Sequence, residues 1–231
     1  GNAVLLKGGT EAKETNLALA EAIDAALSAD ERLKDAVQVL STREQFRELL
    51  KHDDLIDLII PRGSNELVRS IMESTRVPVL GHAAGICHTY VDKSADLDMA
   101  VDVCYDAKVQ YPAVCNAMET LLVHRDIAYD FLPRMASRYK EAKVELRGDE
   151  ETRRAIGALP ATEEDWKEEY NDTVLSIKVV SSLDEAIEHV NRFSSHHTDA
   201  IITSDHEAAA RFMDLVDSSS VMWNASTRFA D

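Results

Sequence analysis

The sequence contains few basic residues for its length. Its 231 residues include 25 lysines and arginines against 42 aspartates and glutamates, which gives a formal net charge of −17 at pH 7. A nucleic-acid-binding surface needs clustered cations to replace the counterions of the phosphates, so this balance argues against nucleic acid as the main partner. An anionic ligand would instead need local cations or backbone N–H groups.

Cysteine is also scarce. The chain has three cysteines, Cys87, Cys104 and Cys115, and no two of them have the spacing of a zinc knuckle. An odd and sparse set does not make a disulfide framework and is typical of reduced thiols in a cytosol-like compartment. We therefore expect neither disulfides nor a metal centre.

Long apolar runs and a secretory leader are lacking as well. No apolar run approaches the length of a membrane-spanning helix, and no charged-then-apolar leader follows Gly1. We therefore expect a soluble protein. The chain opens on GNAVLLKGG, which reads as the tail of a strand entering a loop, and it stops at TRFAD with no evident cap. We expect it to be a fragment of a longer polypeptide.

The apolar content is sufficient for a core. Apolar residues make up 45% of the chain and charged residues 29%, which suits one large domain or two small ones. Strand-like runs alternate with amphipathic helical stretches through short connections, and this alternation predicts an α/β fold with a parallel, doubly wound sheet. The expected strands are residues 3–6, 36–40, 55–60, 77–80, 86–91, 144–146, 175–180, 200–203 and 220–223. The expected helices are residues 10–28, 65–74, 126–142, 183–193 and 205–216. Two further helices are expected, one that opens at a capping box from Ser41 to Glu44 and one that runs from 95–98 to about 108.

Residues 148–171 interrupt this alternation. They are strongly acidic and weakly periodic, so we expect an exposed helix and loop there. A second α/β unit follows Cys115, and a boundary near residues 108–111 would place this thiol at the junction of two lobes. Clefts between lobes commonly hold active sites.

Two loops are candidates for binding an anionic ligand. Lys7-Gly8-Gly9 and Arg62-Gly63-Ser64 each place a cation beside small residues, and the second leads into a helix N-terminus. Bare N–H groups and a fixed positive charge are what a phosphate-bearing ligand requires. Neither loop matches GxGxxG or a Walker A motif, and two solvent-exposed turns would explain the pattern equally well.

The histidines and cysteines give few candidates for chemistry. Cys87 and Cys104 fall within an apolar strand and a helix, and we interpret them as core residues. Cys115 lies in an aperiodic segment beside Asn116, where it is either a buried inert thiol or a nucleophile held in a turn. His82 and His88 are expected to be satisfied structural residues, and the adjacent pair His196-His197 is not expected to chelate.

Several sequence blocks, in order along the chain, resemble those of a known family. They are GNAVLLKGG at Gly1, IDLIIPRGSNELVR at Ile56, VPVLGHAAGICHTYVD at Val77, ADLDMA at Ala95, YPAVCNAMETLLVH at Tyr111, HTDAIITSD at His197 and WNASTRFAD at Trp223. Through these blocks the whole chain resembles the γ-glutamyl phosphate reductase family, a branch of the aldehyde dehydrogenase superfamily. It is especially similar to the reductase part of bifunctional Δ1-pyrroline-5-carboxylate synthases.

The resemblance implies an aldehyde-dehydrogenase-like fold. Residues 1–108 would form a Rossmann-type NADP(H)-binding lobe that lacks its N-terminal part, and residues 109–231 a catalytic lobe. The implied activity is NADPH-dependent reduction of γ-glutamyl phosphate to glutamate 5-semialdehyde and phosphate through a cysteine thioester, in proline biosynthesis. A homo-oligomer and a glutamate 5-kinase, fused or separate, are implied partners. The implied location is cytoplasmic, or mitochondrial in an animal bifunctional enzyme.

The resemblance also assigns roles to individual residues. Cys115 matches the nucleophile of the family, and Glu169 matches the glutamate that holds the nicotinamide ribose. The remaining cofactor-binding residues would be Lys7, Arg62, Gly63 and Ser64, and the substrate-binding residues Asn116, Asn224, Ser226, Thr227 and Arg228, with Arg228 pairing with the substrate carboxylate.

One departure from the wider superfamily bears on the reaction. Aldehyde dehydrogenases that hydrolyse their thioester carry a glutamate in the block matching residues 77–91, and this chain has no aspartate or glutamate there. The absence favours a reductase over the alternative of an NAD-dependent aldehyde dehydrogenase. A second alternative is a non-catalytic assembly segment of a bifunctional pyrroline-5-carboxylate synthase.

Overall fold

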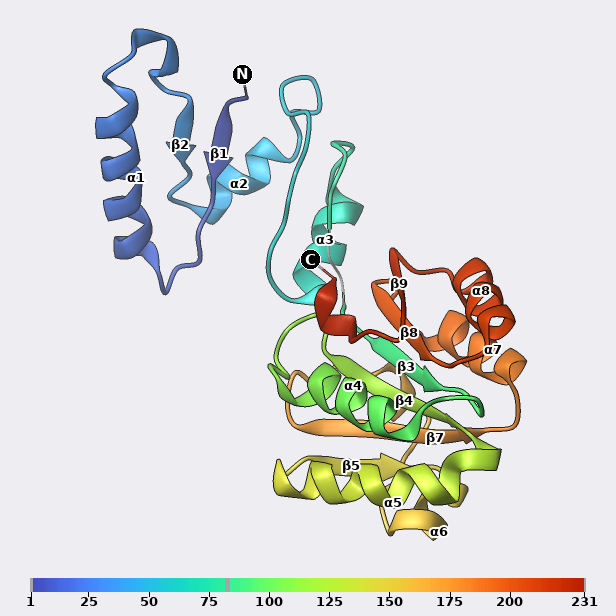
Figure 1. The fold of residues 1–231 in the computed structure, drawn as a ribbon. Coiled ribbons are helices and arrows are strands. Elements are labelled where there is room, and N and C mark those ends of the chain that lie inside the picture. The colour runs from blue at the N-terminus through green and yellow to red at the C-terminus, as the bar shows by residue number, and fades with distance from the viewer. Residues whose placement is uncertain (1, 82–83, 231) are drawn as a thin grey trace. The chain divides into compact units, whose positions relative to one another are not determined.

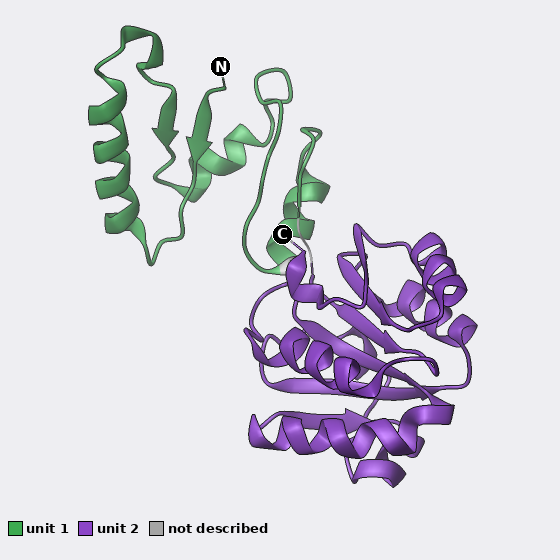
Figure 2. Ribbon diagram, in the orientation of Figure 1, with its two compact units in different colours: residues 1–83 green, residues 84–231 purple. Residues whose placement is uncertain are grey.

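The chain forms two compact units. The computed structural model describes residues 2–81 and 84–230 (Figure 1). Unit 1 spans Gly1–Ala83 and unit 2 spans Ala84–Asp231 (Figure 2). The sequence placed this division at 108/109. The strand and helix between residues 87 and 109 instead belong to unit 2, because that strand is hydrogen-bonded to two strands of the unit 2 sheet.

Unit 1 contains a two-stranded parallel pair and a separate small core. Leu50, Ile59, Ile71 and Val77 form its small core. The strands are β1 (Val4–Leu6) and β2 (Val37–Val39), and the helices are α1 (Lys13–Leu27), η1 (Glu31–Leu33), α2 (Arg43–Leu49) and α3 (Asn65–Ser74).

Three expectations for unit 1 are wrong in detail. Residues 55–60 and 77–80 are not strands, because a single bridge between Ile59 and Val79 is all that joins them. The run at 55–60 is too apolar for an exposed strand and so predicts a strand buried on both faces, yet Leu55 is 71% exposed. The capping box of α2 runs from Thr42 to Gln45, one residue later than expected, because the Thr42 hydroxyl accepts from Gln45 N.

Unit 2 contains a seven-stranded sheet in which all neighbouring strands are parallel. Its strand order is β6-β5-β7-β4-β3-β8-β9. The strands are β3 (Cys87–Val91), β4 (Met118–His124), β5 (Glu145–Gly148), β6 (Leu159–Pro160), β7 (Val174–Val180), β8 (Thr198–Ile202) and β9 (Ser220–Trp223). The central strands β3 and β4 are buried along their whole length, as strands covered on both faces must be.

Helices cover both faces of this sheet. Side chains of α4 and α5, such as Cys104, Phe131 and Met135, pack into one hydrophobic cluster, and side chains of α7 and α8, such as Val190 and Phe212, pack into another. The helices of unit 2 are α4 (Leu97–Val109), α5 (Arg125–Glu141), α6 (Glu150–Ile156), η2 (Asp165–Lys167), α7 (Leu183–Phe193), α8 (His206–Leu215) and η3 (Thr227–Phe229). The predicted α/β class is confirmed.

Residues 148–171 differ from the expected exposed helix and loop. They contain α6, β6 and η2, and Asp165 and Trp166 within η2 are buried. Asp165 accepts hydrogen bonds from Arg147, Tyr170 and the Thr162 backbone, which lower its pKa far below the usual value although burial opposes them. This acidic segment is therefore fixed to the sheet by its own carboxylate.

Candidate active site

Cys115 lies in a turn directly before β4. Its side chain is partly exposed, whereas Cys87 and Cys104 are buried, as predicted for core residues. The Cys87 Sγ donates to the Cys115 carbonyl at 3.3 Å. A methyl group on Gly85 would lie 1.9 Å from that same carbonyl oxygen, so only glycine permits this close approach. Gly85 and Cys87 therefore both contact the backbone of Cys115 and restrict its position.

The surroundings of Cys115 are the amino ends of parallel strands. Glu169 Oε1 accepts from Gly85 N at 2.9 Å, Ser195 Oγ accepts from Ile86 N at 2.8 Å, and Asp199 Oδ1 accepts from His88 N at 2.7 Å. Backbone N–H groups at the start of β3 thus donate to side chains from three places: Glu169 before β7, Ser195 before β8, and Asp199 in β8. Cys115 and Glu169, which the sequence assigned to different roles, both contact Gly85.

The end of the chain is tied to the Cys115 turn. Asn116 is buried, and its Nδ2 donates to the Ala230 carbonyl. Arg228, two residues before Ala230, is partly exposed and donates through Nε to Gln110 Oε1 at 3.0 Å. The structure therefore brings the segment of Arg228 to the segment of Cys115.

Three other predicted substrate-binding residues are engaged in the fold. Asn224 Oδ1 accepts from Thr203 N, and its Nδ2 donates to the Thr203 carbonyl, so its amide continues the pairing beyond β8. The Ser226 hydroxyl caps η3 by accepting from Arg228 N. Thr227 is fully buried, and its Oγ1 makes no hydrogen bond within residues 84–230. A direct contact of these side chains with substrate stays a prediction.

In unit 1 the predicted cofactor residues lie at two loops. Lys7 follows β1, is partly buried and donates through Nζ to the Gly8 carbonyl. Arg62 and Gly63 are exposed, and Gly63 has φ +153°. Ser64 caps α3, its hydroxyl accepting from Leu67 N at 3.3 Å. The N-terminus of α3 thus follows a cation and a glycine, as predicted.

The sequence missed a buried polar cluster beside the site. His88 Nδ1 lies 3.2 Å from Asp199 Oδ1, but neither ring nitrogen of His88 makes a hydrogen bond to another described residue. The expectation of a satisfied His88 is therefore wrong, and His82 lies outside the described residues. Burial between His88, Trp166 and Phe193 lowers the pKa of His189 to about 2, and the nearby His88 and Lys178 act in the same direction.

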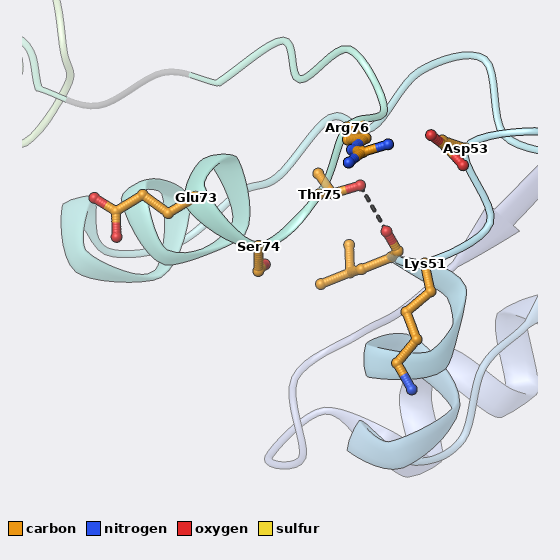
Figure 3. Close-up of a pocket in the computed structure, with 7 residues that line it drawn as sticks. Lys51, Asp53, Glu73, Ser74, Thr75 and Arg76 are labelled. Atoms are coloured by element: carbon orange, nitrogen blue, oxygen red, sulfur yellow. Dashed lines mark hydrogen bonds between the residues drawn. The ribbon is translucent and has the colours of Figure 1, made fainter.

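Two surface cavities contain none of the predicted site residues. One, of about 370 Å³, lies in unit 1, where the Thr75 hydroxyl donates to the Leu50 carbonyl at 2.7 Å (Figure 3). The other, of about 680 Å³, is at the β5–β6 side of unit 2. The cavity in unit 1 is lined by Leu50, Lys51, Asp53, Glu73, Ser74, Thr75 and Arg76. The cavity in unit 2 is lined by Glu145, Arg147, Leu159, Pro160, Thr162, Glu164, Asp165, Glu168 and Tyr170.

Two other kinds of site are absent from the part of the chain that the structure describes. Its histidine, cysteine, aspartate and glutamate side chains form no group of three or more that could hold a metal ion. None of its helices combines the length and apolar character needed to cross a membrane.

The fold and this site define a class of protein. The family model described as "Aldehyde dehydrogenase family" matches residues 1–164, and the chain belongs to this family. A glyceraldehyde-3-phosphate dehydrogenase from Methanocaldococcus jannaschii, solved in complex with NADP, shares the fold with a TM-score of 0.77 at 19% identity, over 100% of this chain and 60% of that one.

More similar proteins point to one branch of the family. The γ-glutamyl phosphate reductase of Pelotomaculum thermopropionicum is 58% identical over 231 residues, which are 100% of this chain and 53% of that protein. The crystal structure of γ-glutamyl phosphate reductase from Thermotoga maritima matches with a TM-score of 0.96 at 41% identity, over 100% of this chain and 56% of that one. The chain therefore spans about half the length of these relatives.

Proposed function

We propose that this chain is part of an NADPH-dependent γ-glutamyl phosphate reductase that makes glutamate 5-semialdehyde and phosphate in proline biosynthesis. The main observation in support is that Cys115 is accessible and has a fixed backbone. It is the partly exposed one of the three cysteines, its backbone is fixed by Gly85 and Cys87, and it lies in the block shared with reductases. A fixed, accessible thiol is what covalent acyl transfer requires.

The proposed reaction has two stages at Cys115. In the first, the thiolate attacks the γ-carbonyl carbon of the acyl phosphate, a C–S bond forms, the C–O bond to phosphate breaks, and phosphate leaves with the electron pair. When bound, the nicotinamide supplies a hydride to the same carbon. Hydride addition would leave a thiohemiacetal alkoxide on Cys115, which re-forms the carbonyl as the C–S bond breaks, so that the aldehyde leaves and Cys115 returns to its thiolate.

Each unit, taken by itself, holds residues suited to part of a nicotinamide dinucleotide. The N-terminus of α3 offers free N–H groups beside Gly63 and the exposed Arg62, which suits a pyrophosphate. Lys7 would hold the phosphate on the adenosine ribose. Glu169 is partly exposed, and no described residue bonds to its Oε2, so this oxygen can accept from a ribose hydroxyl. A protein of the same fold was solved with NADP.

The expected fate of the thioester rests on the sequence of residues 77–91. Residues 77–91, which include the described Gly85 and Cys87 beside the Cys115 carbonyl, contain no carboxylate. A carboxylate base is what would activate water there, so hydrolysis of the thioester should be slow and reduction should win. The same absence argues against an NAD-dependent aldehyde dehydrogenase.

Substrate and partners follow from charge and chemistry. Arg228 is a cation tied to the Cys115 segment through Ala230 and Asn116, and it would bind the carboxylate of the glutamyl group. Asn116, Asn224, Ser226 and Thr227 would shape the same pocket. Acyl phosphates are labile, so a glutamate 5-kinase, fused or separate, is the proposed supplier of substrate, and the proposed assembly is a homo-oligomer.

The test is enzymatic and uses the full-length polypeptide that carries these residues. Glutamate 5-semialdehyde, NADP⁺ and phosphate should give steady NADPH production, and omission of phosphate should stop it. Cys115→Ala should remove the activity, whereas Cys104→Ala, which alters a buried thiol of α4, should keep it. Turnover without phosphate, or activity retained in Cys115→Ala, would contradict the proposal. A non-catalytic assembly segment predicts self-association with no NADPH binding, which calorimetry would show.

A further inference from the structure

A buried ion pair joins α4 to β4 in unit 2. Lys108 Nζ, at the end of α4, contacts Glu119 Oε2, in β4, at 2.6 Å, and the two side chains are 0% and 1% exposed. The proposed reaction uses neither residue. Taking both charges out of water costs several kcal/mol per ion, and apolar residues of similar volume would often be at least as stable. A purely structural explanation of this pair is therefore weak.

The second oxygen of Glu119 has a specific partner. Glu119 Oε1 accepts from the backbone N of Asn171 at 3.3 Å, across 52 residues of sequence. Asn171 is exposed, lies outside regular secondary structure and has φ +53°. Its N–H would otherwise face water, so the carboxylate in the core is what fixes the backbone at this point.

Asn171 is two residues from Glu169, and the intervening segment is short and anchored. Tyr170 places its hydroxyl within 2.7 Å of Asp165 Oδ1 and 2.8 Å of Ser176 Oγ, and Glu169 Oε1 accepts from Gly85 N. Glu119 is thus the anchor on the C-terminal side of Glu169, and Tyr170 is a second anchor on the same side. A shift of Asn171 would move the Glu169 carboxylate.

We infer that Glu119, kept charged and aimed by Lys108, is a positioning residue that holds the Glu169–Asn171 segment so that Glu169 can bind the nicotinamide ribose. This inference rests on the proposed function. Burial raises the pKa of Glu119 to about 7, with the nearby Glu169 adding to the rise, and the Lys108 ammonium opposes both. Lys108 is therefore needed to keep an accepting carboxylate at this depth, and burial in turn lowers the pKa of Lys108.

The test compares two charge-neutral double variants. Lys108→Met/Glu119→Gln and Lys108→Met/Glu119→Met both remove the ion pair and keep unbranched side chains of similar length. They differ in one respect, because the glutamine can still accept from Asn171 N and the methionine cannot. Tyr139→Phe, which deletes the buried hydrogen bond from the Tyr139 hydroxyl to the Cys104 carbonyl on the same helix α4, controls for lost stability alone.

The readouts are NADPH affinity by calorimetry in the full-length polypeptide and the KM for NADPH against kcat. The loss of one buried hydrogen bond should raise the dissociation constant of the methionine variant by about threefold to tenfold over that of the glutamine variant. Its KM for NADPH should rise in parallel. Tyr139→Phe should lower the melting temperature and leave the NADPH dissociation constant unchanged.

Equal NADPH affinities in the two double variants would overturn the positioning role while leaving the proposed function intact. Absence of NADPH binding in the unmodified protein would overturn both. One readout needs neither a variant nor cofactor. In the unmodified 231-residue chain, the Asn171 amide should exchange slowly by nuclear magnetic resonance, although the residue is exposed. Exchange at the rate of a free loop amide would contradict the inference even if no variant folds.

Discussion

The two compact units differ in how much of their apolar surface they cover. In unit 2, the central strands and the helices on both faces bury residues such as Leu121, Phe131 and Ile201 completely. In unit 1, none of the residues of α1 is buried, and Leu80 is 62% exposed. Burial of apolar side chains is the main source of folding stability, so unit 2 should be much the more stable of the two.

The same difference appears among the predicted site residues. In unit 2, Cys115, Asn116, Glu169 and Arg228 are held by contacts that span from 28 to 118 residues of sequence. In unit 1, Lys7 and Ser64 bond only to residues within four positions, among the contacts described. We infer that the geometry of catalysis is fixed by unit 2, and that unit 1 supplies local loops for an anionic cofactor.

The largest expected change in unfolding free energy comes from breaking a buried ion pair in unit 2, compared with an exposed ion pair in unit 1. Lys108→Met leaves the Glu119 carboxylate buried without a cation, which should cost about 3–5 kcal/mol of unfolding free energy. Arg32→Met in unit 1 breaks the exposed pair with Asp30 and should leave the denaturation midpoint unchanged. Denaturant unfolding of both variants checks this, and equal midpoints would contradict the contrast between the units.

The next prediction compares two glycines at which an added Cβ would lie equally close to a neighbouring atom. A Cβ on Gly85 would lie 1.9 Å from the Cys115 backbone oxygen, and a Cβ on Gly9 would lie 1.9 Å from the end of the Glu11 side chain. The first neighbour is backbone and cannot move, whereas the second is an exposed side chain that can. Gly85→Ala should cost about 1–3 kcal/mol of unfolding free energy, and Gly9→Ala should be neutral in stability.

Gly85→Ala should also affect the proposed reaction. Displacing the Cys115 turn by about 1 Å should lower kcat by about 100-fold. Assays of glutamate 5-semialdehyde oxidation in the full-length polypeptide would measure this change. A Gly85→Ala protein with unchanged kcat would show that the Cys115 backbone is not held as tightly as the structure indicates.

Acid should act on unit 2 through His189. Its pKa is about 2 in the folded state because of burial, and about 6.5 in the unfolded state. Above pH 6.5 the ring is neutral in both states. Below pH 6.5 the unfolded state takes up a proton that the folded state does not, so stability falls by about 1.4 kcal/mol per pH unit, or about 2 kcal/mol at pH 5.

His189→Phe should remove this part of the pH dependence and keep the ring contacts with Trp166 and Phe193. The measurement is the unfolding free energy of wild type and variant between pH 5 and pH 8, with the variant giving the shallower slope below pH 6.5. Parallel slopes would mean that His189 is protonated in the folded protein or that its environment is open to water.

The smallest expected effects come from helix caps. Thr42→Ala removes the capping box of α2, and Ser182→Ala removes the hydroxyl that accepts from Glu185 N at the start of α7. Each should cost about 1 kcal/mol. Because α7 packs Ala186 and Val190 into the core, the second loss should appear as faster hydrogen exchange throughout unit 2. The loss from Thr42→Ala should stay within α2 and its neighbours.

Much of unit 2 could be predicted from its sequence. Helix Leu183–Phe193 and strand Ser220–Trp223 were located to the residue, because periodicity and capping are local properties. Unit 1 was predicted less well. Residues 55–60 look like a buried strand, but whether a strand forms depends on neighbours that the local sequence does not specify.

The site could be predicted only in part. The family resemblance singled out Cys115 and Glu169, but their common contact with Gly85 depends on how distant strands align. The pair Lys108 and Glu119 was missed, although a signal was available. Glu119 is a carboxylate inside the apolar run Met118–Val123, and a charge within a buried strand requires a partner.

The most direct test of the proposed chemistry is to trap the thioester at Cys115. The full-length polypeptide is mixed with glutamate 5-semialdehyde and NADP⁺ without phosphate, and both NADPH and the intact protein mass are followed. We predict a single burst of NADPH that matches the number of active sites, a glutamyl adduct on Cys115, and steady turnover once phosphate is added. No burst, an adduct on another residue, or steady turnover before phosphate is added would contradict it.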